Sequence, residues 1–261
     1  MSVLAVIPAR YGSTRFPAKV LAPLAGKPLI QHVWERTRRA AGVDRVVVAT
    51  DDERVAAAVQ GFGGEAVMTP AELPSGTDRV ARAARGLGAQ VVINVQGDEP
   101  LMEPAMVAQL AALMTAHPEI PMATLKHRLS DPRDGASPHV VKVVTDAHGW
   151  ALYFSRAGIP YARNPGQGPG WAKHLGIYAY QAPFLEELVT WPPSPLEQAE
   201  GLEQLRVLEH GARIMVLETP HDTIGVDTPE DLARVEAVLG GARPLKSSVG
   251  AWHRQRGGSS A

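Results

Sequence analysis

Three cations follow the first apolar segment of the chain within ten residues. Residues 3–8 are apolar and of strand length, and the polar loop after them carries Arg10, Ser13, Arg15 and Lys19. In open α/β sheets, ligands bind at the carboxyl ends of the strands, which is where this loop would lie. Backbone amides and fixed cations at such a place suit phosphates, so we interpret the loop as a triphosphate site.

Two acidic residues stand beside the ends of other predicted secondary-structure elements. Asp98 follows the most apolar segment of the chain, and Asp227 stands just before a helix start at Thr228 and Pro229. The helix start accounts for Thr228 and Pro229 as capping and first-turn residues, but it leaves Asp227 without a structural task. Carboxylate and phosphate oxygens are the ligands that Mg²⁺ prefers. We therefore regard Asp98 and Asp227 as a candidate metal clamp.

Two other groups of polar residues suggest ligand contacts. Ser75, Thr77 and Arg79 stand at a predicted helix start, where capping and the binding of an anion or a carbonyl edge are both open. Farther along the chain, cationic, acidic and amide side chains stand beside apolar segments. Although a lone histidine is more often structural, this mixture suits an anionic, polyhydroxylated substrate. Its members are Arg156, His174, Glu203 and Gln204.

Alternating strand-like and helix-like segments in the first half of the chain would position these side chains. Their order predicts a parallel sheet with right-handed crossovers. The segment 91–95 is almost wholly apolar, as in a strand that is covered on both faces. The expected strands are 3–8, 45–50, 65–68 and 91–95, and the expected helices are 28–41, 52–61, 77–88 and 104–117.

The pattern changes after about residue 121, where strand-like segments follow one another without helices between them. This indicates an antiparallel platform inserted into, or added to, the α/β sheet. We expect one domain over 1–243, in which about 121–215 form a substrate and dimerisation lobe, and a loosely ordered tail at 244–261. The expected elements are strands 122–125, 140–145, 150–155, 175–181 and 213–217, a helix over 196–211 and a last helix starting at 228.

The composition excludes several classes of function. The chain has 261 residues, 45% apolar content and a formal net charge of −1, so no global field attracts nucleic acid. It contains no cysteine, which excludes disulfides and thiolate zinc sites and fits a cytoplasmic location. No apolar run is long enough to predict membrane insertion, and no signal peptide is recognisable. Neither a Walker A loop nor a GxGxxG dinucleotide fingerprint follows the first strand.

Six motifs, in order and with compatible spacing, closely resemble those of the 3-deoxy-manno-octulosonate (Kdo) cytidylyltransferases. The resemblance runs from about residue 2 to 239. No single motif decides it, but the six together are highly specific. They are IPARYGSTRFP at 7–17, NVQGDEP at 94–100, YFSR at 153–156, HLGIY at 174–178, LEQLR at 202–206 and GVDTPED at 225–231.

This resemblance implies an activity and a fold. CTP and Kdo would give CMP-Kdo and pyrophosphate for lipopolysaccharide biosynthesis, with Mg²⁺ as cofactor and a homodimer as the assembly. The fold would be α/β, a Rossmann-like nucleotidyltransferase fold with a mainly parallel sheet and an inserted antiparallel dimerisation and sugar-binding lobe. The alternatives are a cytidylyltransferase for another acid sugar, such as amino-Kdo or sialic acid, and a non-catalytic nucleotide-binding module.

The resemblance also assigns roles to individual residues. Arg10, Lys19, Asp98 and Asp227 would be catalytic, and the two aspartates would hold the metal. The residues implied to bind CTP are Arg10, Ser13, Arg15, Lys19, Ser75, Thr77, Arg79 and Gln96. The residues implied to bind the sugar are Arg156, His174, Tyr178, Glu203 and Gln204.

Overall fold

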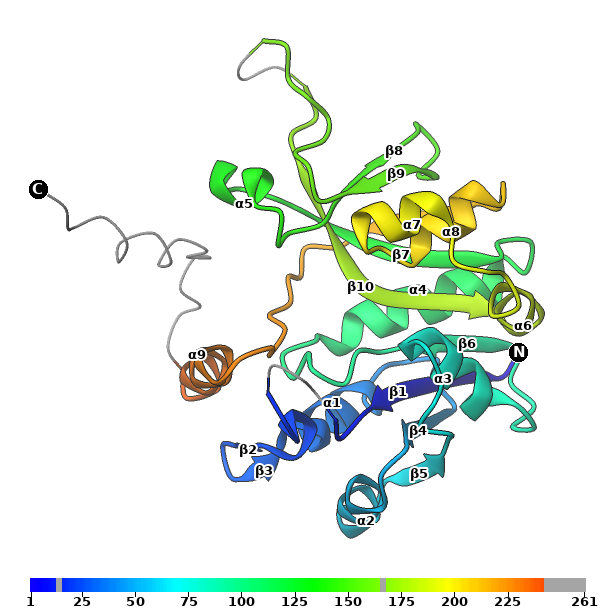
Figure 1. Ribbon diagram of the computed structural model, residues 1–261, viewed down its shortest axis with the longest axis vertical. Coiled ribbons are helices and arrows are strands. Elements are labelled where there is room, and N and C mark those ends of the chain that lie inside the picture. The colour runs from blue at the N-terminus through cyan, green and yellow to red at the C-terminus, as the bar shows by residue number, and fades with distance from the viewer. Residues whose placement is uncertain (13–15, 165–167, 242–261) are drawn as a thin grey trace, which may run out of the picture.

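A computed structural model describes residues 1–12, 16–164 and 168–241 of the chain (Figure 1). Ser13, Arg15 and the tail expected at 244–261 therefore lie outside the described residues. The described strands form one nine-stranded sheet, with the central order β11-β7-β10-β6-β1-β4-β5, and a two-stranded hairpin. No helix in the described part of the chain has the length and apolar character needed to cross a bilayer.

The first half of the chain builds the parallel part of the sheet. Strand β1 lies between β4 and β6 and is parallel to both, and β5 extends the sheet beyond β4. The expected parallel half is confirmed to within one residue at every strand end. The strands are β1 (Val3–Ala9), β4 (Arg45–Thr50), β5 (Glu65–Met68) and β6 (Val91–Asn94).

Helices cover both faces of this sheet because alternate strand residues point to opposite sides. In β1, Ala5 and Ile7 pack with α1, α2 and α4, whereas Leu4 and Val6 pack with α3, α6 and α8. Each face thus has its own apolar core. The helices are α1 (Leu29–Thr37), α2 (Glu53–Gly61), α3 (Gly76–Ala84), α4 (Pro104–Ala116), α6 (Ala182–Leu188) and α8 (Gln204–Glu209).

The antiparallel platform is continuous with the parallel sheet through one long strand, β10. This strand is antiparallel to β6 on one side and to β7 on the other, and it also contacts β8, which pairs with β9. Strand β11 returns parallel to β7. The α/β class with a mainly parallel central sheet is confirmed. These strands are β7 (Met122–Arg128), β8 (Lys142–Thr145), β9 (Ala151–Ser155), β10 (Ala172–Gln181) and β11 (Ile214–Glu218).

The helix expected over 196–211 is wrong as a single element. Gly201, at φ +62°, ends α7 (Pro195–Glu200), and α8 begins at Gln204. A left-handed backbone conformation is accessible to glycine and interrupts an α-helix. The break brings Glu203 to the start of α8. The sequence analysis also missed α5, α6, a short 3-10 helix and the hairpin, whereas the last helix starts where expected. These elements are α5 (Pro132–Ala136), the 3-10 helix (Lys19–Leu21), β2 (Pro23–Leu24), β3 (Lys27–Pro28) and α9 (Pro229–Leu239).

The loop after β6 passes so close to the end of β1 that only glycine fits at position 97. A Cβ added to Gly97 would lie 2.6 Å from the carbonyl oxygen of Pro8. Backbone atoms at that distance cannot yield without moving one of the two segments. Because Asp98 follows directly, the contact fixes where the carboxylate leaves the sheet.

We therefore predict that Gly97→Ala destabilises the fold. Overpacking of this kind costs about 1–3 kcal/mol of unfolding free energy, measured by chemical denaturation. Gly61→Ala is the matched control, because Gly61 stands in α2 with no atom within 4 Å of an added Cβ. That change should be neutral or stabilising by up to about 1 kcal/mol. Equal stability of wild type and Gly97→Ala would contradict the close approach.

Candidate functional site

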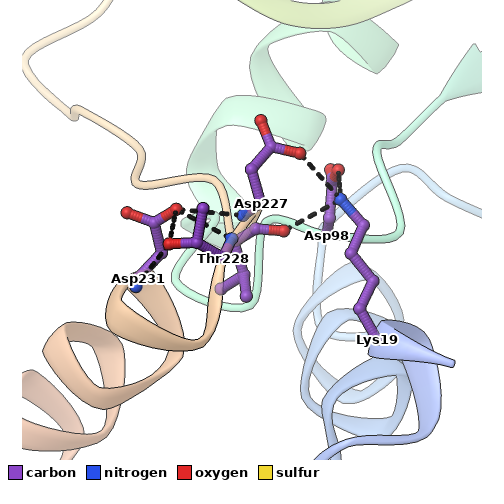
Figure 2. Close-up of polar contacts among 6 residues, drawn as sticks. Lys19, Asp98, Asp227, Thr228 and Asp231 are labelled. Atoms are coloured by element: carbon purple, nitrogen blue, oxygen red, sulfur yellow. Dashed lines mark hydrogen bonds and ion pairs between the residues drawn. The ribbon is translucent and has the colours of Figure 1, made fainter. Parts of the chain in front are cut away.

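Lys19 lies between the two candidate metal ligands. Its Nζ donates to Oδ2 of Asp98 at 2.7 Å and to Oδ1 of Asp227 at 3.0 Å (Figure 2). The carbonyl oxygen of Val226 accepts a third bond at 2.9 Å. One ammonium group thus connects three segments that are far apart in the sequence. The expectation that these three residues share a site agrees with this geometry.

Each of the three side chains is placed by the end of a regular element. Lys19 begins the 3-10 helix after β1, and Asp98 stands in the turn after β6. Asp227 immediately precedes α9, where Thr228 and Asp231 form a reciprocal capping box. Oδ2 of Asp231 also accepts the backbone N–H of Asp227 at 3.1 Å, as Figure 2 shows. The cap that starts the helix therefore also orients the residue before it.

The electrostatics of this cluster keep Lys19 charged. Burial of its side chain, which is 12% exposed, acts to lower the pKa of Lys19, but the Asp98 and Asp227 carboxylates outweigh it and raise the pKa. The two carboxylates are more open to solvent, at 32% and 45% side-chain exposure. A cation at this point balances two like charges that would otherwise repel each other.

The oxygens around Lys19 also fit a hard divalent cation. Two carboxylates and a backbone carbonyl already surround a positive charge, and Mg²⁺ is commonly bound by one or two carboxylates with substrate phosphates completing the shell. The described residues contain no group of three or more His, Cys, Asp or Glu side chains that could hold a metal. A metal at Asp98 and Asp227 would thus need oxygens from a ligand or from water.

The described residues expected on the nucleotide side are half-buried, except for Arg79. Arg10 donates to the carbonyl oxygen of Leu73 at 2.7 Å and thereby ties the first loop to the segment before α3. Ser75 caps α3, exchanging hydrogen bonds with the backbone and side chain of Asp78. Gln96 donates to the carbonyl oxygen of Gly176 at 3.0 Å, which links the turn after β6 to β10.

Arg79 is wholly buried, so its guanidinium does not reach the surface of the site. It donates to Oδ2 of Asp51 at 2.8 Å and to the hydroxyl of Thr69. Burial lowers the pKa of Arg79, and the Asp51 carboxylate opposes that effect. In this geometry Arg79 holds together the ends of β4 and β5, and its expected contact with CTP stays a prediction.

A pocket joins the expected nucleotide side to the expected sugar side. Thr77 donates to Oε2 of Glu203 at 2.7 Å, across 126 positions of sequence. The Nε2 group of Gln204 is buried here without a hydrogen-bond partner. Buried polar groups are normally paired, so this donor is available to an acceptor in the pocket. The pocket is lined by Ser75, Thr77, Asp78, Met122, Tyr178, Tyr180, Leu188, Val189, Glu203, Gln204, Arg206 and Val207.

Three polar pocket residues were absent from the expected site: Asp78, Tyr180 and Arg206. Tyr180 could have been found, because it stands two positions from Tyr178 and therefore on the same face of β10. Arg206 of α8 pairs with Glu197 of α7, so its position depends on the break between these two helices. A single expected helix over 196–211 did not predict that arrangement.

Arg156 and His174 do not line the pocket. Arg156 donates through Nε to the carbonyl oxygen of Glu200 at 2.7 Å and through Nη1 to that of Pro138 at 3.1 Å. His174 is buried between Phe154 and Tyr178, with ring centroids 5.0 and 5.3 Å away. Their expected sugar contacts stay predictions, since the structure brings Tyr178, Glu203 and Gln204 together without them.

His174 is held in its neutral form. Nε2 lies 3.2 Å from the hydroxyl of Thr124, and that hydroxyl is also 2.7 Å from the carbonyl oxygen of Ile177. With the single hydroxyl proton directed to the nearer carbonyl, we assign the ring proton of His174 to Nε2. Burial, assisted by the charge of Lys173, lowers the pKa of His174 to about 3. The ring thus supplies fixed hydrogen-bonding groups and no charge at neutral pH.

Comparison with known proteins identifies the class of this chain. The sequence model of the cytidylyltransferase family matches residues 4–214, so the chain belongs to that family. A "3-deoxy-manno-octulosonate cytidylyltransferase" of Geobacter sulfurreducens is 53% identical over 245 residues, covering 90% of this chain and 98% of the relative. One of Syntrophotalea carbinolica is 52% identical, covering 92% and 100%. Within the cytidylyltransferases, the chain is a member of this 3-deoxy-manno-octulosonate group.

Solved structures agree with this assignment. A structure titled as CMP:2-keto-3-deoxy-manno-octonic acid synthetase complexed with CTP has 46% sequence identity and a TM-score of 0.89, covering 92% of this chain and 99% of its own. A cytidylyltransferase from Leptospira borgpetersenii, at 17% identity and a TM-score of 0.62, shares the fold. The expected Rossmann-like nucleotidyltransferase fold is confirmed.

We predict a pH-dependent contribution of His174 to stability. The unfolded histidine protonates near its ordinary pKa of 6.5, whereas the folded one does so only near 3. The contribution is therefore complete above about pH 6.5 and is lost as the pH falls toward 3, with a slope of up to about 1.4 kcal/mol per pH unit. His174→Gln, which keeps a donor for Thr124, should flatten unfolding free energy against pH in this window. His148→Gln, at an exposed turn residue, is the control, and identical slopes for wild type and His174→Gln would refute the assignment.

Proposed function

We propose that this protein transfers CMP from CTP to the anomeric hydroxyl of Kdo, releasing pyrophosphate and giving CMP-Kdo for lipopolysaccharide biosynthesis. The observation that carries the proposal is the meeting of Asp98, Asp227 and Lys19 at one edge of the sheet. The names of the relatives and of the similar CTP-bound structure support the choice of CTP and Kdo.

In this proposal, Mg²⁺ held by Asp98 and Asp227 supplies Lewis acidity to the sugar hydroxyl and the α-phosphate when it is bound. Lys19 and Arg10 bind the triphosphate and stabilise charge on the departing pyrophosphate. Ser13 and Arg15, which lie outside the described residues, are further candidates for binding the phosphates. The carboxylates of Asp98 and Asp227 orient the ammonium of Lys19, which lies within hydrogen-bond reach of both. No side chain is assigned as a general base.

The pocket would bring the two substrates next to each other. Ser75, Thr77 and Gln96 face the nucleoside, whereas Tyr178, Glu203 and Gln204 face the sugar. The hydrogen bond from Thr77 to Glu203 supports this adjacency, because it joins the two groups directly. The unpaired Nε2 of Gln204 is compatible with a hydroxylated partner, because a hydroxyl oxygen can accept its hydrogen bond.

Assembly and location are further parts of the proposal. The protein acts as a homodimer through the lobe at about 121–215, and it works in the cytoplasm without nucleic acid or membrane insertion. The motif resemblance supports the dimer, and the composition supports the location.

The substrate assignment is tested by pyrophosphate release from CTP with Mg²⁺ and a panel of acid sugars. We expect release with Kdo, detected together with CMP-Kdo, and much slower release with sialic acid. Faster release with amino-Kdo or sialic acid than with Kdo would identify that sugar as the substrate in place of Kdo. CTP binding without turnover on any sugar would identify a non-catalytic nucleotide-binding module and overturn the proposal.

The metal assignment predicts that Asp98→Asn and Asp227→Asn each abolish most turnover. Loss of one preorganised electrostatic contact in an active site costs roughly 10²–10³-fold in rate. Glu230→Gln is the matched control, because Glu230 is an exposed acid in the first turn of α9. Its turnover should equal that of wild type, while circular dichroism confirms the fold of all three variants. Near-normal turnover of Asp227→Asn at low Mg²⁺ would remove Asp227 from the site.

A further inference from the structure

Asp227 is carried by a segment without regular secondary structure. Strand β11 ends at Glu218, α9 begins at Pro229, and the residues between them form neither helix nor strand (Figure 1). We call residues 222–226 the strap. Because no ladder of backbone hydrogen bonds holds the strap, the position of Asp227 depends on individual contacts.

One end of the strap is tied to the middle of the sheet by Lys173. Its Nζ donates to Oδ1 of Asp222 at 2.7 Å and to the carbonyl oxygen of Thr223 at 2.9 Å. The same Oδ1 accepts the backbone N–H of Thr223 at 2.8 Å. Lys173 belongs to β10, where it lies opposite Lys142 of β8 and His127 of β7. The ammonium is thus anchored on a strand that has neighbours on both sides.

The other end of the strap is tied to the turn that carries Asp98. The backbone N–H of Val226 donates to the carbonyl oxygen of Asp98 at 2.9 Å, and the Val226 side chain is fully buried. The side chain of Thr223 hydrogen-bonds to Glu99, which follows Asp98 directly. Between these two ends only residues 224 and 225 remain. The strap is therefore short, and release of its Asp222 end would leave the Val226 contacts and the α9 cap as the remaining restraints on Asp227.

We propose that Lys173 is a positioning residue, which holds the strap against β10 so that Asp227 faces Asp98. This inference rests on the proposed function, in which the two aspartates hold the metal. Lys173 touches neither aspartate. A partly exposed ion pair alone is worth little, but here the ammonium also bonds a backbone carbonyl, so its loss releases the chain itself.

The test replaces Lys173 by Met, which keeps the length of the side chain and removes its charge. We expect the dissociation constant of Mn²⁺ in the presence of CTP without sugar, measured by electron paramagnetic resonance, to rise about three- to tenfold. The Mg²⁺ concentration for half-maximal turnover should rise equally. CTP binding without metal should stay unchanged, and the amide proton of Val226 should exchange faster.

Controls separate positioning from a general loss of stability. Arg85→Gln removes another exposed ion pair, with Glu186 at 2.8 Å, and should change neither metal binding nor exchange at Val226. Lys173→Arg, which keeps the charge, should restore most of the metal affinity. Asp222→Asn leaves the bond from Lys173 to the Thr223 carbonyl in place, so it should have a smaller effect than Lys173→Met. The double variant should add little to Lys173→Met, because the lysine makes both contacts.

Several outcomes would overturn the proposal. Unchanged Mn²⁺ affinity and unchanged exchange at Val226 in Lys173→Met would show that the strap holds without the lysine. A raised requirement for the sugar alone would make Lys173 a substrate contact instead. If Lys173→Met does not fold, Asp222→Asn tests the same two readouts, with smaller changes in the same direction, and no change in either readout would overturn the proposal. If wild type shows no turnover on any sugar, the proposed function fails, whereas exchange at Val226 still decides whether Lys173 holds the strap.

Discussion

Two ionised carboxylates that face one another repel unless a positive charge lies between them, and this constraint organises the site. Asp98 and Asp227 come from chain segments far apart in sequence, and both bond the ammonium of Lys19. The turn at Gly97, the capping box of α9 and the 3-10 helix after β1 each deliver one member of this group. Loss of Lys19 would leave like charges facing each other without compensation, whereas displacement of either aspartate would leave Lys19 with a single carboxylate.

The same charge balance limits what Lys19 does in the proposed reaction. An ammonium that donates to Asp98, Asp227 and the Val226 carbonyl has used all three of its protons. It cannot then donate to a phosphate without releasing a partner. Binding of a triphosphate by Lys19 therefore entails an exchange of partners, in which the carboxylates need another source of positive charge. A divalent cation that enters with the nucleotide meets this need.

The sequence predicted the parts of the fold whose signals are local. The strands of the parallel half are continuous apolar segments, and Thr228 with Pro229 marks a helix start without ambiguity. The strand-end rule also placed Lys19 and Asp98 at one edge. It did not predict that β10 joins both halves of the sheet, because strand pairing over such separations has no local signal. The break at Gly201 was missed because a single glycine is tolerated within a helical pattern.

The sequence also did not predict which charged side chains are buried. Arg79 and Lys142 are both wholly inaccessible to solvent, although Arg and Lys are almost never fully buried without partners. Arg79 has Asp51, and Lys142 donates to the backbone carbonyls of Ser137, Val140 and Arg156. Such partners become apparent only once the chain has folded. A cation near a motif therefore indicates a ligand contact only when its partners are known.

Strand β10 shows how one element can serve both halves of the proposed site. Alternate residues of a strand point to opposite faces, so Lys173 reaches the strap on one face, while its neighbour His174 packs on the other face against Tyr178, which lines the pocket. A slip of one residue in the pairing of β10 would exchange these faces. The pairing of Tyr178 with Asn94 of β6 opposes such a slip. The register of this single strand thus sets where the strap is held and which side chains line the pocket.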